Sequence, residues 1–330
     1  MKALVATDIG ATPKMALEER PSPEPKAGYT LVKMHAATVN PLSNQIRHGH
    51  VPAARAPLVL SNDGSGFVIA SDKYLPGARV AIYGSGDLGV KEDGLQQQEV
   101  LVANKWIVEL PDNISLTEAA ALPINYVSAY QAIQRVGLLQ SGQTALVSGA
   151  SGSVGHALIQ LINAFGATPI AVVSNTSKVD SARDSGAAHI IDLSKQSLVD
   201  SVLLLTNGKG VDLAFDTVAG DILEPLIKSL KSRGTAVSIG FAGGVKPVID
   251  IVDIVVFEKR LLGFDAHLER DEDVQTVISS ICRLIEQEKI RPRIDSVFPL
   301  AEYEEAYRYL ESRKAKGSVL LKLDTIQEET

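Results

Sequence analysis

The stretch that decides the fold is TALVSGASGSVGHALIQL, residues 144–161. A short apolar segment at 145–148 leads into a glycine-rich run, and residues 154–165 follow with apolar side chains at helical spacing. A buried strand, a glycine-rich turn and a helix in this order can bind the pyrophosphate of a dinucleotide. The turn could also be a tight connection without a ligand. The strand before it and the helix after it favour the phosphate-binding alternative.

The residues of this turn have separate expected roles. Gly152 lets the backbone approach a pyrophosphate closely, and Gly155 lets the helix pack against the strand. The N–H groups of Ser153 and Val154 would point at the phosphates, with the positive end of the helix behind them. Ser151 completes the set of residues that we expect around the phosphates.

The chain beyond Pro123 alternates strands and helices. Apolar strands are expected at 169–173, 189–192, 211–216, 235–240 and 261–265, and a helix is expected at 178–185. Short, fully apolar strands that alternate with helices indicate a parallel sheet with both faces covered. We therefore expect a doubly wound α/β domain over residues 123–265.

The segments on either side of this domain are richer in β-strand patterns. Strands are expected at 2–6, 29–36, 66–69, 79–83 and 99–102, with turn signals between them. A helix is expected to begin at Ser115 or Thr117. The last part of the chain predicts helices at 271–285 and 302–313 and a final strand at 318–323. We expect residues 1–122 and 266–330 to form one β-rich domain into which the α/β domain is inserted.

Length and composition exclude several classes of protein. The 330 residues are 45% hydrophobic and 22% charged with a net charge of −7, so the chain lacks the basic surface that nucleic acids require. Cys282 is the single cysteine, which excludes an internal disulfide and a cysteine-rich metal site. The first residues do not form a secretory signal, and no apolar run reaches the ~18 residues of a membrane span. We expect a cytoplasmic protein without nucleic-acid or membrane partners.

The residues after the second strand of the α/β domain bear on which dinucleotide binds. NAD-binding folds place an Asp or Glu there for the ribose hydroxyls, whereas this chain has no acid before Asp180. Ser174, Asn175 and Lys178 offer a hydroxyl, an amide and an ammonium group, which would accept a 2′-phosphate that a carboxylate would repel. Lysine is unfavourable at a helix N-terminus, and a phosphate would compensate it. We predict NADPH rather than NADH, with a solvated first-turn lysine as the alternative for Lys178.

Several stretches together resemble one known family. They are HAATVNP (35–41), IRHG (46–49), SNDGSG (61–66), PGARV (76–80), LPDNISLTEAAALP (110–123), the glycine-rich turn, SGAAHIID (185–192), GVDLAFDTVAG (210–220) and KGSVLLKL (316–323). In this order they resemble the medium-chain dehydrogenase/reductase superfamily and, within it, the zinc-free quinone oxidoreductases related to ζ-crystallin. The resemblance implies a GroES-like catalytic domain, an inserted Rossmann domain and a cleft between them that holds NADPH.

The resemblance also implies further site residues. Cofactor contacts are expected on the later strands of the Rossmann domain, at Val218, Gly240, Phe241, Ala242, Phe264 and Asp265. The polar groups expected near the nicotinamide are Asn40, Ser128, Tyr126 and, less specifically, His50. Tyr126 could equally be a packed helix residue. The chain departs from the family pattern at Ser61, where a glycine is usual, and at Leu193, where a tyrosine stacks on the cofactor.

The positions that hold zinc in metal-dependent relatives indicate the chemistry. A cysteine and a histidine hold the metal there, and the matching residues in this chain are Asn40 and Asn62. Amides are poor zinc ligands, and His48 with His50 lacks a third ligand, so we predict no metal. Alcohol oxidation needs a Lewis acid or a strong base, whereas a quinone or an enone is already electrophilic. We therefore predict an NADPH-dependent, zinc-independent reductase that transfers a hydride to a quinone or another α,β-unsaturated carbonyl acceptor and in which the protein supplies position.

The sequence leaves two alternative functions open, and it also predicts a homodimer. The chain could be an enoyl or alkenal reductase with little quinone activity, or an NADPH-binding sensor or structural protein without turnover, because fold alone does not decide. Residues 259–268 suggest an apolar edge strand of the Rossmann sheet, which predicts a homodimer with Leu262 and Phe264 near the seam. The alternative is an edge that the chain's own tail helix covers.

Overall fold

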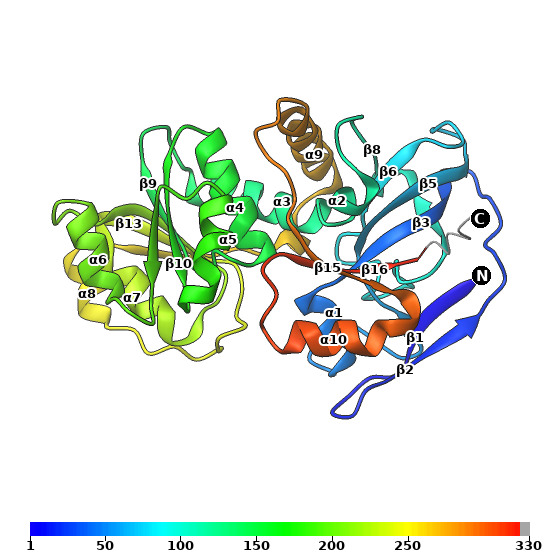
Figure 1. Cartoon of the computed structure of the whole chain (residues 1–330), viewed down its shortest axis with the longest axis horizontal. Helices are drawn as coiled ribbons and strands as arrows, with labels where there is room; N and C mark the ends of the chain where they lie inside the picture. Colours follow the sequence, from blue (N-terminus) through cyan, green and yellow to red (C-terminus); the bar gives the residue numbers. More distant parts are fainter. Residues whose placement is uncertain (324–330) are drawn as a thin grey trace. The chain divides into compact units, whose positions relative to one another are not determined.

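The computed structural model describes residues 1–323 of the chain. The chain divides into two compact units, and Figure 1 labels the helices and strands of both. Unit 1 holds Met1–Ile124 together with the segment from Glu269 onward, and unit 2 holds Asn125–Leu268. The predicted fold class, a β-rich GroES-like domain with an inserted Rossmann domain, is confirmed by the sheets described below.

Unit 1 contains two sheets. The smaller sheet has the strand order β2-β1-β4, formed by β1 (Lys2–Asp8), β2 (Lys14–Glu19) and β4 (Leu58–Val59). The larger sheet has the order β15-β16-β3-β5-β6-β8, and β7 pairs with β3. Its strands are β3 (Tyr29–Val39), β5 (Asp63–Ser71), β6 (Arg79–Tyr83), β7 (Glu99–Ala103), β8 (Ile107–Glu109), β15 (Ile294–Pro299) and β16 (Ser318–Lys322). Because β16 pairs antiparallel with β3, the segments before and after unit 2 contribute to one sheet.

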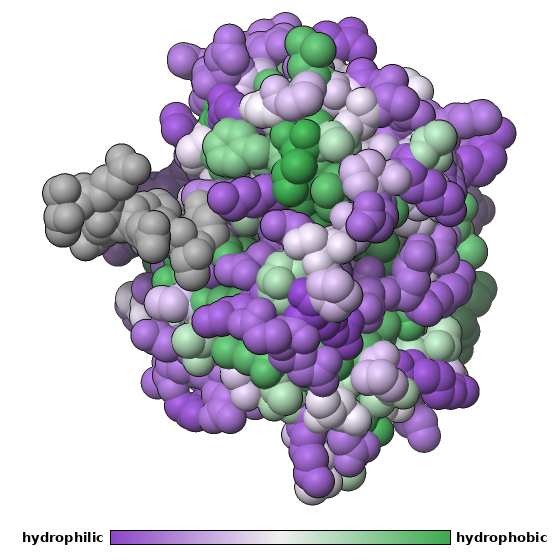
Figure 2. Space-filling view, turned by 90° about the vertical axis from the view of Figure 1, so that its right-hand side faces the viewer, coloured by the Kyte–Doolittle hydropathy of each residue, from purple (hydrophilic) through white to green (hydrophobic). Residues whose placement is uncertain are grey.

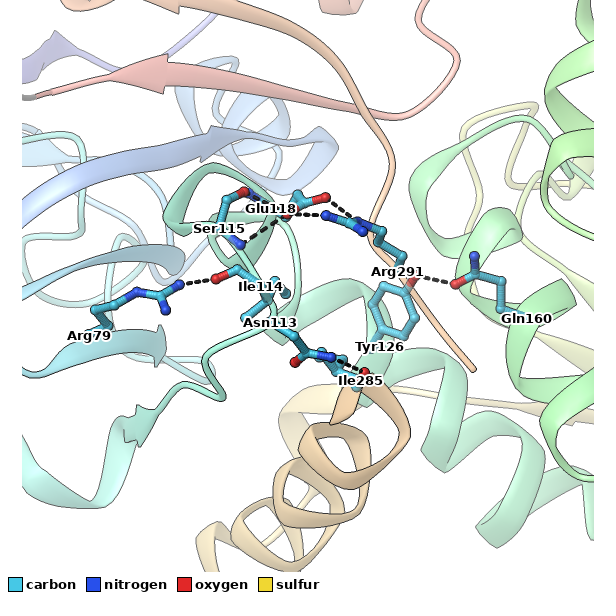
Figure 3. Close-up of polar contacts among 9 residues, drawn as sticks. All are labelled: Arg79, Asn113, Ile114, Ser115, Glu118, Tyr126, Gln160, Ile285 and Arg291. Carbon is cyan, nitrogen blue, oxygen red and sulfur yellow. Dashed lines mark hydrogen bonds and ion pairs between the residues drawn. The ribbon is translucent and has the colours of Figure 1, made fainter. Parts of the chain in front are cut away.

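Among the residues that the structure describes, four helices lie wholly within unit 1. They are α1 (Pro41–Arg47), α2 (Leu116–Ala120), α9 (Asp271–Glu286) and α10 (Tyr303–Glu311), with the 3-10 turns η1 (Asn104–Trp106) and η6 (Leu300–Glu302). Ser115, not Thr117, caps α2, in a capping box with Glu118. Glu118 also forms an ion pair with Arg291, which joins the two segments of the chain within this unit (Figure 3).

The core of unit 1 is one large hydrophobic cluster. It includes Leu4, Val32, Met34, Ile46, Leu60, Ile82, Leu95, Ile107, Tyr307 and Leu321. The face of the molecule drawn in Figure 2 carries mainly hydrophilic side chains, with smaller hydrophobic areas between them. No helix among residues 1–323 has the combination of length and apolar character that a membrane crossing needs.

Unit 2 is built on a six-stranded parallel sheet. The strands are β9 (Thr144–Val147), β10 (Thr168–Val173), β11 (His189–Asp192), β12 (Val211–Asp216), β13 (Leu230–Ser238) and β14 (Arg260–Gly263). Their order is β11-β10-β9-β12-β13-β14, so the direction of strand addition reverses at β9. The sheet is therefore doubly wound, as the sequence predicts. Leu146, Ile170, Ile191, Ala214 and Leu226 are part of the core beside this sheet.

Helices flank this sheet in Figure 1. They are α3 (Pro123–Gln131), the π-helix η2 (Ala132–Gly137), α4 (Ser153–Ala164), α5 (Val179–Asp184), α6 (Leu198–Leu205), α7 (Leu223–Lys228) and α8 (Ile251–Val256). The 3-10 turns are η3 (Thr176–Lys178), η4 (Gly220–Ile222) and η5 (Ala266–Leu268).

The structure corrects some predicted elements. The predicted strands 79–83, 189–192 and 211–216 coincide with β6, β11 and β12. The prediction missed β2, which is largely polar, β4 and β8, which have two and three residues, and the six-residue strand β15. The predicted edge strand 259–268 is too long, because β14 ends at Gly263. Phe264 is only 9% exposed in the single chain, and its predicted place near a dimer seam stays a prediction.

Candidate cofactor and active site

The predicted cofactor residues come together at one edge of the parallel sheet. Residues 151–155 follow β9, residues 174–178 follow β10, and Val218 follows β12. Residues 240–242 follow β13, and residues 264–265 follow β14. In doubly wound sheets, ligands bind at this carboxyl edge, next to the strand where the order reverses. That strand is β9, which leads directly into the glycine-rich turn.

The glycine-rich turn has space where a phosphate would lie. A Cβ on Gly155 would overlap the carbonyl oxygen of Gly149 and lie 2.8 Å from Cα of Ala150, so only glycine permits this close packing of α4. A Cβ on Gly152 would meet only the carbonyl oxygen of Gly149, at 3.4 Å. Gly152 is the N-cap of the twelve-residue helix α4, so the positive end of the helix dipole lies at this turn. The turn therefore fits a pyrophosphate.

A buried carboxylate organises the loop after β12. Asp216 accepts the hydroxyl of Ser148 at 2.5 Å and the N–H groups of Val218 and Ala219 at 3.0 Å. Ala219 has φ 57° and ψ −157°, a conformation that is almost confined to glycine. The bonds to Asp216 hold this strained residue beside Val218. Sequence analysis missed Asp216, although an acid as the last residue of an apolar strand is a signal that could have found it.

The loop after β10 carries the groups predicted to accept a 2′-phosphate. Ser174 and Asn175 are exposed. The side chain of Asn175 bridges the loop, since its Oδ1 accepts the N–H of Ser177 at 3.1 Å and its Nδ2 donates to the hydroxyl of Ser174 at 3.2 Å. Lys178 is the N-cap of α5, which starts one residue later than predicted. Lys178 therefore lies just before the helix and not inside its first turn.

Asn40 and Asn62, the two residues that the sequence analysis matches to zinc ligands, are adjacent within unit 1. Nδ2 of Asn40 lies 3.2 Å from Oδ1 of Asn62, and Asn62 donates to the carbonyl oxygen of Ser85 at 3.0 Å. Oδ1 of Asn40 accepts the N–H of Ser43 at 2.8 Å and so caps α1. Both ends of the Asn40 amide are therefore engaged within the protein. Its predicted role as a donor to the substrate requires one of these bonds to open.

A buried carboxylate that sequence analysis missed lies next to Asn40. Asp63 is 1% exposed, and its Oδ1 accepts the hydroxyl of Thr38 and, at 3.3 Å, Nδ2 of Asn40. Burial raises the pKa of Asp63 to about 7, although these hydrogen bonds act in the opposite direction. Ser61, in place of the usual glycine, has φ 74° and donates to the carbonyl oxygen of Asp63 at 3.0 Å.

Tyr126 and Ser128 lie on α3. Tyr126 is 1% exposed, and its hydroxyl donates to Oε1 of Gln160 on α4 at 2.7 Å (Figure 3). Burial raises the pKa of Tyr126 well above its usual value, so the hydroxyl stays protonated. This placement favours the packed helix residue over the catalytic group, the two alternatives that the sequence leaves open. Ser128 is 7% exposed, and its catalytic role stays a prediction.

In the described part of the chain, residues 1–323, no three His, Cys, Asp or Glu side chains are placed to hold a metal ion together. His48 contacts Glu311, with Nε2 3.0 Å from Oε1, and its ring lies 6.3 Å from that of His50 between centroids. The reaction without zinc stays a prediction.

Comparisons with known proteins cover both units. The family model described as alcohol dehydrogenase GroES-like domain matches residues 26–112, and the one described as zinc-binding dehydrogenase matches residues 153–282. A quinone oxidoreductase of Pseudomonas aeruginosa is 31% identical over 307 residues, which cover 90% of this chain and 92% of that protein.

Solved structures are similar over almost the full length. A structure described as an NAD-dependent alcohol dehydrogenase has a TM-score of 0.90 at 27% identity, covering 98% of this chain and 100% of that one. A mycobacterial protein in complex with NADPH has a TM-score of 0.85 at 25% identity, covering 98% of this chain and 99% of that one. The two neighbours thus differ in the cofactor that their descriptions name.

Proposed function

This chain belongs to the medium-chain dehydrogenase/reductase superfamily and is an oxidoreductase, and from this premise we propose that it reduces quinones or other α,β-unsaturated carbonyl compounds with NADPH. The proposal includes a reaction without zinc, a cytoplasmic location, and no nucleic-acid or membrane partner. The bound nicotinamide would supply the hydride, and the protein would supply position and hydrogen bonds.

The space at Gly152 carries the proposal. A phosphate in this space would meet the N–H groups of Ser153 and Val154 at the positive end of α4. Ser151 is buried in the same turn, and Gly155 allows the helix to approach it. The chain's own part in binding is therefore a preformed anion site at the switch point of the sheet.

The residues after β10 support NADPH over NADH. β10 ends at Val173, and the following loop presents Ser174, Asn175 and Lys178 without a carboxylate of its own. A hydroxyl, an amide and an ammonium group would bind a 2′-phosphate, whereas an acid here would bind the ribose hydroxyls. The solved neighbours name both cofactors, so the residues of this loop alone support the choice of NADPH.

The amides at the zinc-ligand positions support an electrophilic acceptor. Asn40 and Asn62 bond to each other, and neither side chain is a good zinc ligand. An acceptor that is already electrophilic needs only weak donors for the charge that develops on its carbonyl oxygen. Asn40 and Ser128 are the proposed donors, and water would supply the proton.

The acceptor class separates this proposal from its alternative, an enoyl or alkenal reductase with little quinone activity. We suggest measuring NADPH oxidation by the purified protein with quinones, 2-enals and 2-enones, and with saturated aldehydes as controls. Fast turnover of quinones supports the proposal. Turnover of 2-enals or 2-enones with little quinone activity supports the alternative. NADPH binding without reduction of any acceptor contradicts both.

A homodimer through the edge of the unit 2 sheet is part of the proposal. All four residues of β14 are exposed at the end of the strand order. Exposed apolar side chains gather in the same stretch of the chain, at Val245, Val248, Ile251, Val252, Val255, Val256, Phe257, Leu261 and Leu262. A second copy that pairs β14 with β14 would extend the sheet and could cover part of this surface.

The dimer is tested by sedimentation of the wild-type chain and of a Val255→Glu variant at micromolar concentration. Val255 is 68% exposed, so the substitution should leave the fold intact. We expect a wild-type dimer and a monomeric variant. A wild-type monomer, or a variant that stays dimeric, would reject this assembly.

A further inference from the structure

The carboxylate of Asp192, on the strand next to β10, lies beside the loop that we propose to bind the 2′-phosphate of NADPH. β10 and β11 are parallel neighbours, with Val173 opposite Asp192. Asp192 is the last residue of β11 and is thus level with the residue just before Ser174. Sequence analysis missed it because it sought an acid only after β10. The strand order of the sheet decides that the end of β11 lies at this position.

The carboxylate of Asp192 binds both its own loop and the loop after β10. Its Oδ2 accepts the hydroxyl of Thr176 at 2.6 Å. Its Oδ1 accepts the hydroxyl of Ser194 at 2.6 Å and the N–H of Ser194 at 3.0 Å. The bonds from Ser194 and Thr176 lower the pKa of Asp192, so the group is ionised at neutral pH. The loop after β10 is therefore tied to β11 by a charge-assisted hydrogen bond.

We propose that Asp192 is a positioning residue that sets the preference for NADPH by holding Thr176. The inference rests on the proposed NADPH-dependent function. The hydroxyl proton of Thr176 is used by Asp192, so Thr176 is an anchor and not a donor to the phosphate. With Asn175 bridging Ser174 and Ser177, the loop is held from two sides in one shape. In this shape Ser174 and Lys178 would meet the 2′-phosphate.

The negative charge of Asp192 would weaken NADPH binding, whereas its hold on the loop would strengthen it. Loss of the carboxylate therefore tells the two contributions apart. A carboxylate near a 2′-phosphate repels it, which would favour NADH. Both carboxylate oxygens, however, accept hydrogen bonds from the protein, and Asp192 is only 7% exposed. A preorganised loop binds without the cost of ordering. If positioning exceeds repulsion, loss of the carboxylate weakens NADPH binding, and if repulsion exceeds positioning, loss of the carboxylate strengthens it.

The chain offers a matched pair of variants. Thr176→Val removes the hydroxyl that anchors the loop and keeps the side-chain shape, while Ser194→Ala removes a bond of equal length to the same carboxylate on the other side. Thr176→Ser restores the hydroxyl, and Asp192→Asn removes the charge. The dissociation constants of NADPH and NADH are measured by cofactor fluorescence for each variant, with thermal unfolding beside them.

We expect Thr176→Val and Asp192→Asn to lower the NADPH-to-NADH preference by roughly ten- to hundredfold, the range of a lost hydrogen bond to a charged group. Thr176→Ser and Ser194→Ala should keep it within about twofold. An unchanged preference in Thr176→Val, equal losses for both cofactors, or tighter NADPH binding by Asp192→Asn overturns the inference alone. A wild-type protein that does not bind NADPH overturns the proposed function and this inference with it.

Discussion

Replacing Gly152 by valine should abolish NADPH binding and leave the fold intact, whereas replacing Gly155 by alanine should destabilise the fold. Both glycines belong to one turn, and they differ in what surrounds an added side chain. At Gly155 the new Cβ would overlap the carbonyl oxygen of Gly149 and lie 2.8 Å from Cα of Ala150. At Gly152 the nearest atom is 3.4 Å away, and the rest of the space is open.

The expected magnitudes follow from these surroundings. Overpacking against backbone atoms at Gly155 should lower the free energy of unfolding by about 1–3 kcal/mol, which corresponds to a fall of roughly 2–10 °C in Tm. Gly152 has φ −82° and ψ 170°, which valine adopts without strain. The poorer N-cap should cost about 1 kcal/mol. The valine side chain would occupy the proposed phosphate position and should weaken NADPH binding at least about 100-fold, equivalent to about 3 kcal/mol.

The assay combines a fluorescence titration with NADPH and thermal unfolding of each variant. The wild-type chain is the reference for both. If Gly152→Val binds NADPH within about threefold of the wild type, the turn is not the pyrophosphate site. If Gly155→Ala is as stable as the wild type, the close packing of α4 on the turn is not a constraint.

Three further substitutions have defined expected results. Lys178→Ala should weaken the binding of NADPH by about 1–3 kcal/mol and leave the binding of NADH nearly unchanged. Equal losses of affinity for the two cofactors in titrations would contradict the proposal that Lys178 binds the 2′-phosphate. The pKa of Asp63 is raised from 3.8 to about 7, so between these pH values the folded chain retains a proton that the unfolded chain releases. The stability due to this group is therefore fully present below about pH 4 and is lost as pH rises to about 7. Asp63→Asn should remove this pH-dependent fall in the free energy of unfolding, which is of the order of 4 kcal/mol at most. The free energy of unfolding is measured by denaturant titration at several pH values, and the same pH dependence in the wild type and the variant would refute the raised pKa. Ala219→Gly should stabilise the chain by about 1 kcal/mol, since relief of about 1–3 kcal/mol of backbone strain exceeds the added unfolded-state entropy, and a lower Tm would show that Ala219 is not strained.

The parts of the fold that depend on local pattern could be predicted from the sequence. The apolar run before the glycine-rich turn and the helical spacing after it specify β9 and α4, and the alternation beyond them specifies the doubly wound sheet. The predicted cofactor residues follow these strands, so they share one edge of the sheet without further information. Polar strands such as β2 carry no such pattern, and their pairing is set by neighbours distant in sequence.

The groups that the sequence does not reveal depend on contacts between distant segments. Asp63 titrates near neutral pH because the folded chain buries it, and no local pattern encodes that burial. Asp192 reaches Thr176 only because β11 is the neighbour of β10. Tyr126 and Gln160 are distant in sequence, and their hydrogen bond distinguishes a packed tyrosine from a catalytic one.

The central claim is that this chain passes a hydride from NADPH to an electrophilic carbonyl compound without a metal. The most direct measurement compares NADPH oxidised with quinone reduced by protein dialysed against a chelator, with its zinc content determined by elemental analysis. If the reaction needs no metal, the protein should consume equal amounts of NADPH and quinone. Its zinc content should be far below about one atom per chain. Its activity after dialysis should equal that of undialysed protein. About one zinc per chain before dialysis, with activity lost when the zinc is removed, would contradict it.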